Sequence, residues 1–169
     1  DIFIPLTEEI GLQWLSENIT PSHEYFIKGL IIRKLLISIE DIKPVPSNSD
    51  KIYVLFLPDN EVHELGLLYL NYELLKDGNQ TIYLGTSASK ESLELLVSCY
   101  DNISFISYFT IAPTKIEVNM FLREINQTIL TKYDLSLILL GRNAQEASFK
   151  SKHIKVFNKI DDLLNKTIS

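Results

Sequence analysis

The chain has 169 residues, with 16 basic and 22 acidic side chains, a formal net charge of −6 and a pI near 5.1. This length fits one α/β domain with a small extension and is too short for two full-sized domains. The acidic balance argues against this chain as a surface that grips a phosphate backbone, so any contact with DNA would need another segment. The hydrophobic fraction of 46% predicts a packed globular protein, and no apolar run reaches membrane-spanning length.

Cys99 is the single cysteine of the chain. One thiol excludes an internal disulfide framework and a cysteine-built zinc site, which favours a reducing, cytoplasmic location. The chain begins at Asp1 with neither an initiator Met nor a signal-like segment, so we expect a piece of a longer cytoplasmic protein.

The first part of the chain is predicted to be helical. Apolar spacing predicts one helix over residues 7–18 and a second over residues 21–39, together a helical hairpin that forms a cap domain over residues 1–42. The apolar residues on one face of the second helix are Phe26, Leu30 and Ile37. Residues 43–50 contain two prolines and a polar cluster, which predicts a linker.

From residue 51 to residue 169, short apolar runs alternate with amphipathic segments. The predicted strands are 52–57, 81–84, 103–109, 135–140 and 154–157. The predicted helices carry apolar side chains at helical spacing within 65–75, 93–100, 118–129 and 160–168. Alternation of about five strands with helices predicts an α/β fold with a parallel sheet covered on both faces, a doubly wound, flavodoxin-like domain.

Ligands of such a fold bind at the carboxyl ends of the strands, where His63, Gly85, Ser107 and Gly141 are predicted to lie. His63 follows Glu61 by two residues, at the junction of a predicted strand and helix. An imidazole with a carboxylate beside it suits a metal ligand whose second nitrogen is oriented by that carboxylate. The alternative for His63 is ordinary polar surface near the start of a helix.

Three short segments stand out at the ends of the predicted strands. They are Glu61-Val62-His63-Glu64-Leu65-Gly66, Ser107-Tyr108-Phe109 and Gly141-Arg142. In order and spacing they resemble Asp-x-His-x-x-Gly, then Ser-x-Leu, then Gly-Gly, the signature of the cobalamin-binding domain of methionine synthases, corrinoid proteins and MerR-type transcriptional regulators. In addition, Trp14 is followed after nine intervening residues by Glu24-Tyr25, which resembles the Trp and Glu-His of the helical cap in the light-responsive CarH and LitR regulators.

The resemblance implies that His63 binds the cobalt of cobalamin in place of the cofactor's own dimethylbenzimidazole. Glu61 would accept the proton on the other ring nitrogen; its alternative is an acid placed at a helix start by the helix dipole. The nucleotide tail would pass over Gly66 and Gly141, and Ser107 would hydrogen-bond to it.

Three larger side chains depart from the signature around the tail. They are Tyr108, Phe109 and Arg142. Arg142 stands where the second glycine is expected and would either narrow the path of the tail or contact its phosphate.

On the upper side of the corrin, the resemblance implies that Trp14 and Glu24 shelter the axial group of adenosylcobalamin or methylcobalamin. The indole would stack on that group, and the carboxylate would bind a ribose hydroxyl. Leu15 stands where the light-responsive regulators place a second histidine that binds cobalt after photolysis, and Tyr25 replaces their next histidine, so we expect no switch by bis-histidine ligation. The alternative for Trp14 is a core position.

The leading hypothesis is therefore a cobalamin-sensing, homo-oligomerising domain of a MerR-type regulator, with the DNA-binding segment upstream of this chain. One alternative is a corrinoid carrier that serves a methyltransferase, and another is a degenerate domain that no longer binds cobalamin. Catalysis by the chain itself is not expected, since it has no Gly-rich phosphate loop and no nucleophile elbow.

Overall fold

The computed structural model describes residues 20–43, 50–86 and 88–167, and the chain divides into two compact units, Asp1–Lys43 and Pro44–Ser169. The predicted helix over 7–18 and most of the predicted linker lie outside the described residues. Of the helices in the described ranges, none combines the length and the apolar character needed to cross a bilayer.

The described part of the first unit is helix α2 (Pro21–Glu40). It starts at a capping box, in which the Thr20 hydroxyl accepts from the His23 amide and His23 Nδ1 accepts from the Thr20 amide. The predicted apolar face formed by Phe26, Leu30 and Ile37 is exposed, and the buried residues of the helix are Ile31 and Leu35. Helical spacing marks both faces as apolar and cannot tell which one is covered.

The described residues of the second unit form one five-stranded parallel sheet. The strands are β1 (Ile52–Phe56), β2 (Gln80–Gly85), β3 (Ile103–Tyr108), β4 (Ser136–Leu140) and β5 (Ile154–Val156). Their order is β2-β1-β3-β4-β5, and every neighbouring pair is parallel. This is the flavodoxin-like order, so the fold class predicted from the alternating pattern is confirmed.

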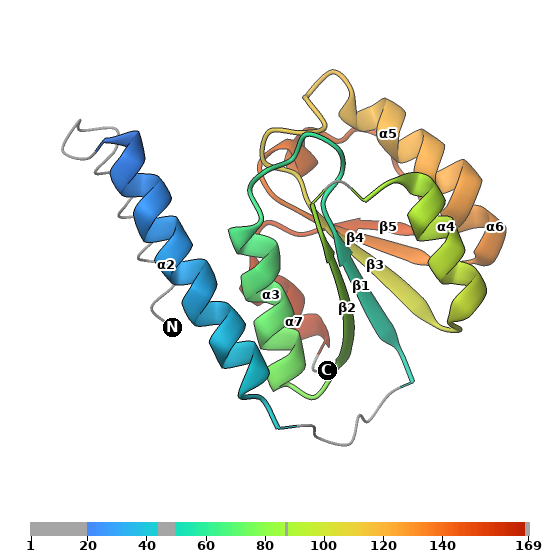
Figure 1. The fold of residues 1–169 in the computed structure, drawn as a ribbon. Helices are drawn as coiled ribbons and strands as arrows, with labels where there is room; N and C mark the ends of the chain where they lie inside the picture. Colours follow the sequence, from blue (N-terminus) through green and yellow to red (C-terminus); the bar gives the residue numbers. More distant parts are fainter. Residues whose placement is uncertain (1–19, 44–49, 87, 168–169) are drawn as a thin grey trace. The chain divides into compact units, whose positions relative to one another are not determined.

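Helices cover both faces of the sheet (Figure 1). Helices α3 (Leu65–Lys76) and α7 (Ile160–Thr167) lie on one face, and α4 (Lys90–Cys99) and α5 (Val118–Ile125) lie on the other. The core under α4 and α5 is built from alternate strand residues such as Val54, Phe56 and Phe105, all fully buried. Strands covered on both faces read as nearly continuous apolar runs, which is why the sequence located them.

The structure also corrects the single helix predicted over 118–129. Helix α5 passes into a π-helical segment, η1 (Asn126–Leu130), and then a short helix, α6 (Thr131–Tyr133). Buried Ile129 and Leu130 keep facing the core across the wider turn. After α6, buried His153 places its Nδ1 2.9 Å from the carbonyl oxygen of Leu135.

Gly141 allows the chain after β4 to touch the chain after β3. It has φ +95°, and a Cβ on it would lie 2.4 Å from the carbonyl oxygen of Phe109. That carbonyl accepts from the Asn143 amide at 2.9 Å, while the Phe109 amide donates to Leu140 at 2.8 Å. The Phe109 backbone therefore cannot withdraw without breaking hydrogen bonds.

We expect Gly141→Ala to lower the free energy of unfolding by ~3 kcal/mol or more, because it adds this clash to the strain of a left-handed backbone. Gly85→Ala is the matched control: Gly85 also has a positive φ, +68°, but its Cβ would lie 3.5 Å from the Tyr83 ring, an ordinary contact. Gly85→Ala should therefore lower the free energy of unfolding by only about 1 kcal/mol. Urea unfolding followed by circular dichroism measures both free energies, and equal losses in the two variants would contradict the clash at Gly141.

Candidate functional site

The candidate site lies where the strand order reverses. Strand β1 has β2 on one side and β3 on the other, so the loops that follow β1 and β3 leave the sheet next to each other. In doubly wound folds this switch point is where ligands bind. The loop after β1 turns sharply at Asn60, which has φ +67°, and this turn brings the next residue, Glu61, back over the sheet edge.

Glu61 joins the two loops through its carboxylate. Oε2 accepts hydrogen bonds from three successive backbone amides of the loop after β3, those of Thr110 at 2.7 Å, Ile111 at 2.7 Å and Ala112 at 3.0 Å. Oε1 accepts from the backbone amide of His63 at 2.9 Å and from its ring Nδ1 at 2.8 Å. The side chain is fully buried, and these bonds satisfy both oxygens.

The charge of Glu61 is stabilised by its hydrogen bonds. Burial alone would raise its carboxyl pKa, but the backbone amides of Ala112, Ile111 and His63 and the His63 ring lower the pKa below its usual value. The carboxylate is therefore ionised at neutral pH. It acts only as an acceptor, so His63 Nδ1 must be the donor.

This donor role fixes the tautomer of His63. With the proton on Nδ1, the neutral ring carries its lone pair on Nε2. The side chain is 48% exposed, and within the described part of the chain no residue hydrogen-bonds to Nε2. The arrangement is a half-exposed imidazole whose second nitrogen is oriented by a buried carboxylate, as metal-binding histidines usually are.

Gly66 and Ser107 lie close to the same loops but face protein. A Cβ on Gly66 would lie 3.1 Å from the ring of Tyr108, so this ring covers the first turn of α3. Ser107 is fully buried, and its hydroxyl donates to the carbonyl oxygen of Phe56 at 2.8 Å.

The other predicted residues of the sheet edge have different surroundings. Gly85 ends β2, and its carbonyl accepts from the Leu57 amide at 2.8 Å. Gly141 contacts the Phe109 backbone as described above. Arg142 is exposed at the start of a short 3₁₀ helix, η2 (Asn143–Glu146). Among the described candidate residues, only Glu61 and His63 form a side-chain hydrogen bond with each other.

The predicted upper-side residues belong to the first unit. Glu24 and Tyr25 lie on α2, and both are exposed, Tyr25 by 74%. Trp14 lies outside the described residues. Their predicted roles therefore remain predictions.

Sequence reasoning missed the amides of residues 110–112, which contribute three of the five hydrogen bonds to Glu61. The contributing groups are backbone N–H, and the side chains of Thr110, Ile111 and Ala112 give no signal of this role. Only the requirement that a buried carboxylate be hydrogen-bonded pointed to partners of some kind.

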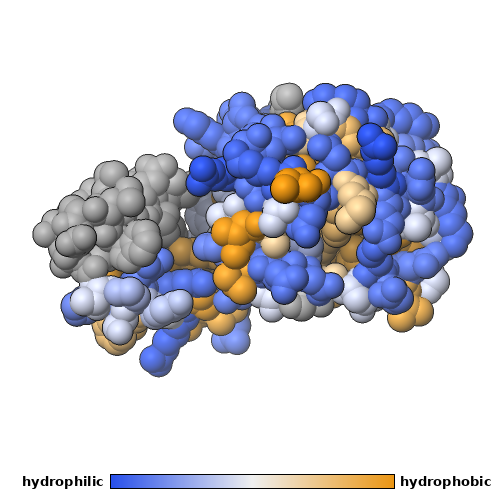
Figure 2. All heavy atoms as spheres, turned by 90° about the horizontal axis from the view of Figure 1, so that it is seen from above, coloured by the Kyte–Doolittle hydropathy of each residue, from blue (hydrophilic) through white to orange (hydrophobic). Residues whose placement is uncertain are grey.

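A cavity of about 500 Å³ opens beside the loops that follow β1 and β3. It is lined by residues of both loops, including Pro58, Asp59 and Ile111, and by α5 residues such as Met120. Figure 2 looks onto the edge of the sheet where the strands end and shows apolar side chains among mainly hydrophilic ones. Exposed apolar residues of this region are Val62, Ile111, Ile116 and Met120.

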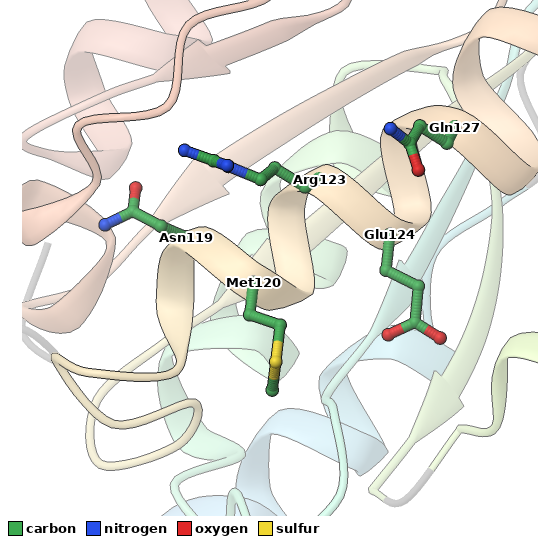
Figure 3. A pocket seen from close by; sticks show the side chains of 5 residues that line it. All are labelled: Asn119, Met120, Arg123, Glu124 and Gln127. Carbon is green, nitrogen blue, oxygen red and sulfur yellow. The ribbon is translucent and has the colours of Figure 1, made fainter.

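A second hollow of about 420 Å³ is lined by Asn119, Met120, Arg123, Glu124 and Gln127. Figure 3 shows that these side chains come from one continuous helix and point in different directions. Asn119 Oδ1 accepts from the amides of Ser148 and Phe149, and the Arg123 guanidinium lies over the Phe149 ring. Both side chains thus fix the chain after η2, and the hollow presents no converging polar groups.

We expect Glu61→Gln to lower the free energy of unfolding at neutral pH by about 2–4 kcal/mol, because an amide nitrogen would face N–H donors in a buried position. The pKa of Glu61 is lowered by folding, so its stabilisation is complete above the ordinary carboxyl range and is lost as pH falls through the lowered value. The difference in free energy of unfolding between the wild type and Glu61→Gln should therefore shrink as the pH falls.

The matched control is Glu117→Gln. Glu117 also accepts from a backbone amide, that of Thr114, and its pKa is also lowered, but it is exposed. A much smaller loss is expected there. Urea unfolding at several pH values measures both variants, and equal losses would contradict a special role of the buried carboxylate.

No protein-family model matches the sequence, and no curated protein matches it. Solved structures do match. The monomethylamine corrinoid protein of Methanosarcina barkeri aligns with a TM-score of 0.65 and 9% identity, over 95% of this chain and 76% of that one. A cobalamin-binding protein from Desulfitobacterium hafniense DCB-2 aligns with a TM-score of 0.55 and 13% identity, over 94% of this chain and 74% of that one. At these identities the likeness is one of fold: the chain has the α/β fold that both proteins share.

Proposed function

We propose that the α/β unit binds a corrinoid and that His63 is an axial ligand of its cobalt ion. The observation that carries this proposal is the pair formed by His63 and buried Glu61. A ligand histidine needs a neutral ring, a free nitrogen accessible from outside and a fixed orientation, and the 2.8 Å contact between Nδ1 and Oε1 supplies the last of these.

The chemistry of the donor fits cobalt. Imidazole nitrogen is a good ligand for metals of intermediate softness, and a carboxylate on the opposite ring nitrogen makes the ligating nitrogen more basic. The three amides that hold Glu61 keep this carboxylate ionised and in place, so the orientation of His63 does not depend on solvent. Bound there, the corrinoid would supply organometallic or axial-ligand chemistry, and the chain would supply its position.

Two further observations support a corrinoid. The exposed apolar side chains of Val62, Ile111 and Ile116 give the loops after β1 and β3 an apolar surface that a large macrocycle could cover. The fold is also that of two solved proteins named for binding corrinoid or cobalamin.

For the role of the bound corrinoid, we favour the sensing and oligomerising domain of a MerR-type regulator. It is supported by the Trp14 and Glu24 spacing in the sequence and by the net charge of −6, which suits a segment that leaves DNA contact to another part of the protein. The second candidate is a corrinoid carrier for a methyltransferase, favoured by the likeness to the monomethylamine corrinoid protein. Both are binding rather than catalytic functions.

Replacement of His63 tests whether it is the axial ligand of cobalt. Mixed with cobinamide, a corrinoid without a nucleotide tail, the full chain should give a coloured protein peak on gel filtration and a visible spectrum typical of histidine ligation. His63→Ala should lose this spectrum and bind at least about tenfold more weakly, as expected for loss of a metal ligand. His23→Ala, which removes an exposed histidine of α2, should behave as the wild type. An unchanged spectrum in His63→Ala would exclude this ligand.

The assembly state of the chain separates a sensor from a carrier. A sensor changes its assembly state because the ligand binds one state more tightly than the other. We therefore expect the molar mass from light scattering to change when adenosylcobalamin, methylcobalamin or cobinamide saturates the chain. A mass that stays constant under all three ligands, with binding verified by colour, would favour the carrier.

A further inference from the structure

The space beside Gly66, between the first turn of α3 and the sheet, is filled by a side chain of the protein. The ring of Tyr108, from the end of β3, lies so close that a methyl group on Gly66 would be 3.1 Å from its Cε2 and Cζ atoms. That distance is tighter than most real carbon contacts, so no additional group fits between ring and helix. Burial raises the pKa of Tyr108, which keeps its hydroxyl protonated.

The neighbouring polar and backbone groups are also occupied. The Ser107 hydroxyl donates to the carbonyl oxygen of Phe56 inside the sheet, so it is not turned toward a ligand. The close approach that Gly141 permits is used by the Phe109 backbone, 2.4 Å from where a Cβ would be. Both glycines thus accommodate protein atoms rather than an open channel.

When a histidine takes over the lower axial position of a complete cobalamin, the dimethylbenzimidazole and its nucleotide leave the cobalt. They must then lie either in a channel of the protein or in solvent. The Glu61–His63 pair suits an axial ligand of cobalt, whereas the space beside Gly66 and Gly141 is occupied by the Tyr108 ring and the Phe109 backbone.

From this disagreement we infer that the site selects corrinoids without a bulky lower nucleotide, of the cobinamide type, and that Tyr108 is the residue that sets this selectivity. The inference rests on the proposed function, since it concerns the ligand of the same histidine. A corrinoid lacking the nucleotide reaches His63 from the exposed side and leaves Tyr108 in place. A complete cobalamin has to displace the ring or keep its nucleotide in solvent.

The test compares affinities for cobinamide and cobalamin that carry the same upper ligand, by visible titration of the full chain. The wild type should bind cobinamide roughly ten- to hundredfold more tightly, the range produced by forcing a group into a filled interior. Part of any preference could come from cobalamin itself, whose own base competes with His63 for cobalt. That part is a property of the ligand and is the same for every variant.

Tyr108→Ala therefore isolates the contribution of the protein. It should bring the two affinities closer by at least about tenfold, mainly by improving cobalamin binding, whereas Tyr108→Phe, which keeps the ring, should retain the wild-type ratio. If the alanine variant does not fold, Tyr108→Leu removes the ring while keeping apolar volume, and the same change of ratio is expected in the same direction.

The outcomes distinguish the two proposals. Equal wild-type affinities, or a ratio that stays the same without the ring, would overturn the selectivity while leaving corrinoid binding intact. Absence of colour with both ligands would overturn the proposed function itself. A preference that disappears without the Tyr108 ring supports both.

Discussion

The buried carboxylate of Glu61 is the interaction on which the site depends. Glu61 follows the left-handed Asn60 and joins the loops after β1 and β3. It accepts three hydrogen bonds from amides of the loop after β3 and two from His63 in the loop after β1. A buried carboxylate without such partners would carry a large desolvation penalty. The same bonds that remove this penalty also set the position of the loops and the tautomer of His63.

The fold could be read from the sequence because its elements are buried on characteristic faces. Strands β1, β3 and β4 form nearly continuous apolar runs, and the intervening helices repeat apolar residues at helical spacing. The α2 face and the interruption of α5 were not predictable in this way. Helical spacing does not tell which of two apolar faces is covered. The apolar residues of 118–129 follow ordinary helical spacing up to Ile129, so they give no sign of the π-helical turn.

At the site, residue types in the sequence identified Glu61 and His63 but not the groups packed around them. A histidine two residues after a carboxylate, at a strand-to-helix junction, was enough to single out Glu61 and His63. The amides of 110–112 are backbone groups without a residue signature, and the position of the Tyr108 ring over Gly66 depends on how α3 packs on the sheet. Contacts between segments more than forty residues apart follow from packing rather than from local pattern.

The π-helical segment Asn126–Leu130 has a consequence for comparing this chain with others. A turn of this kind accommodates one residue more than an α-helical turn without rotating the helix on either side of it. A protein with one residue fewer between Glu124 and Thr131 could therefore keep every buried side chain of α5 in the same place. When such chains are aligned at low identity, a one-residue gap belongs inside this helix, although gaps are usually assigned to loops.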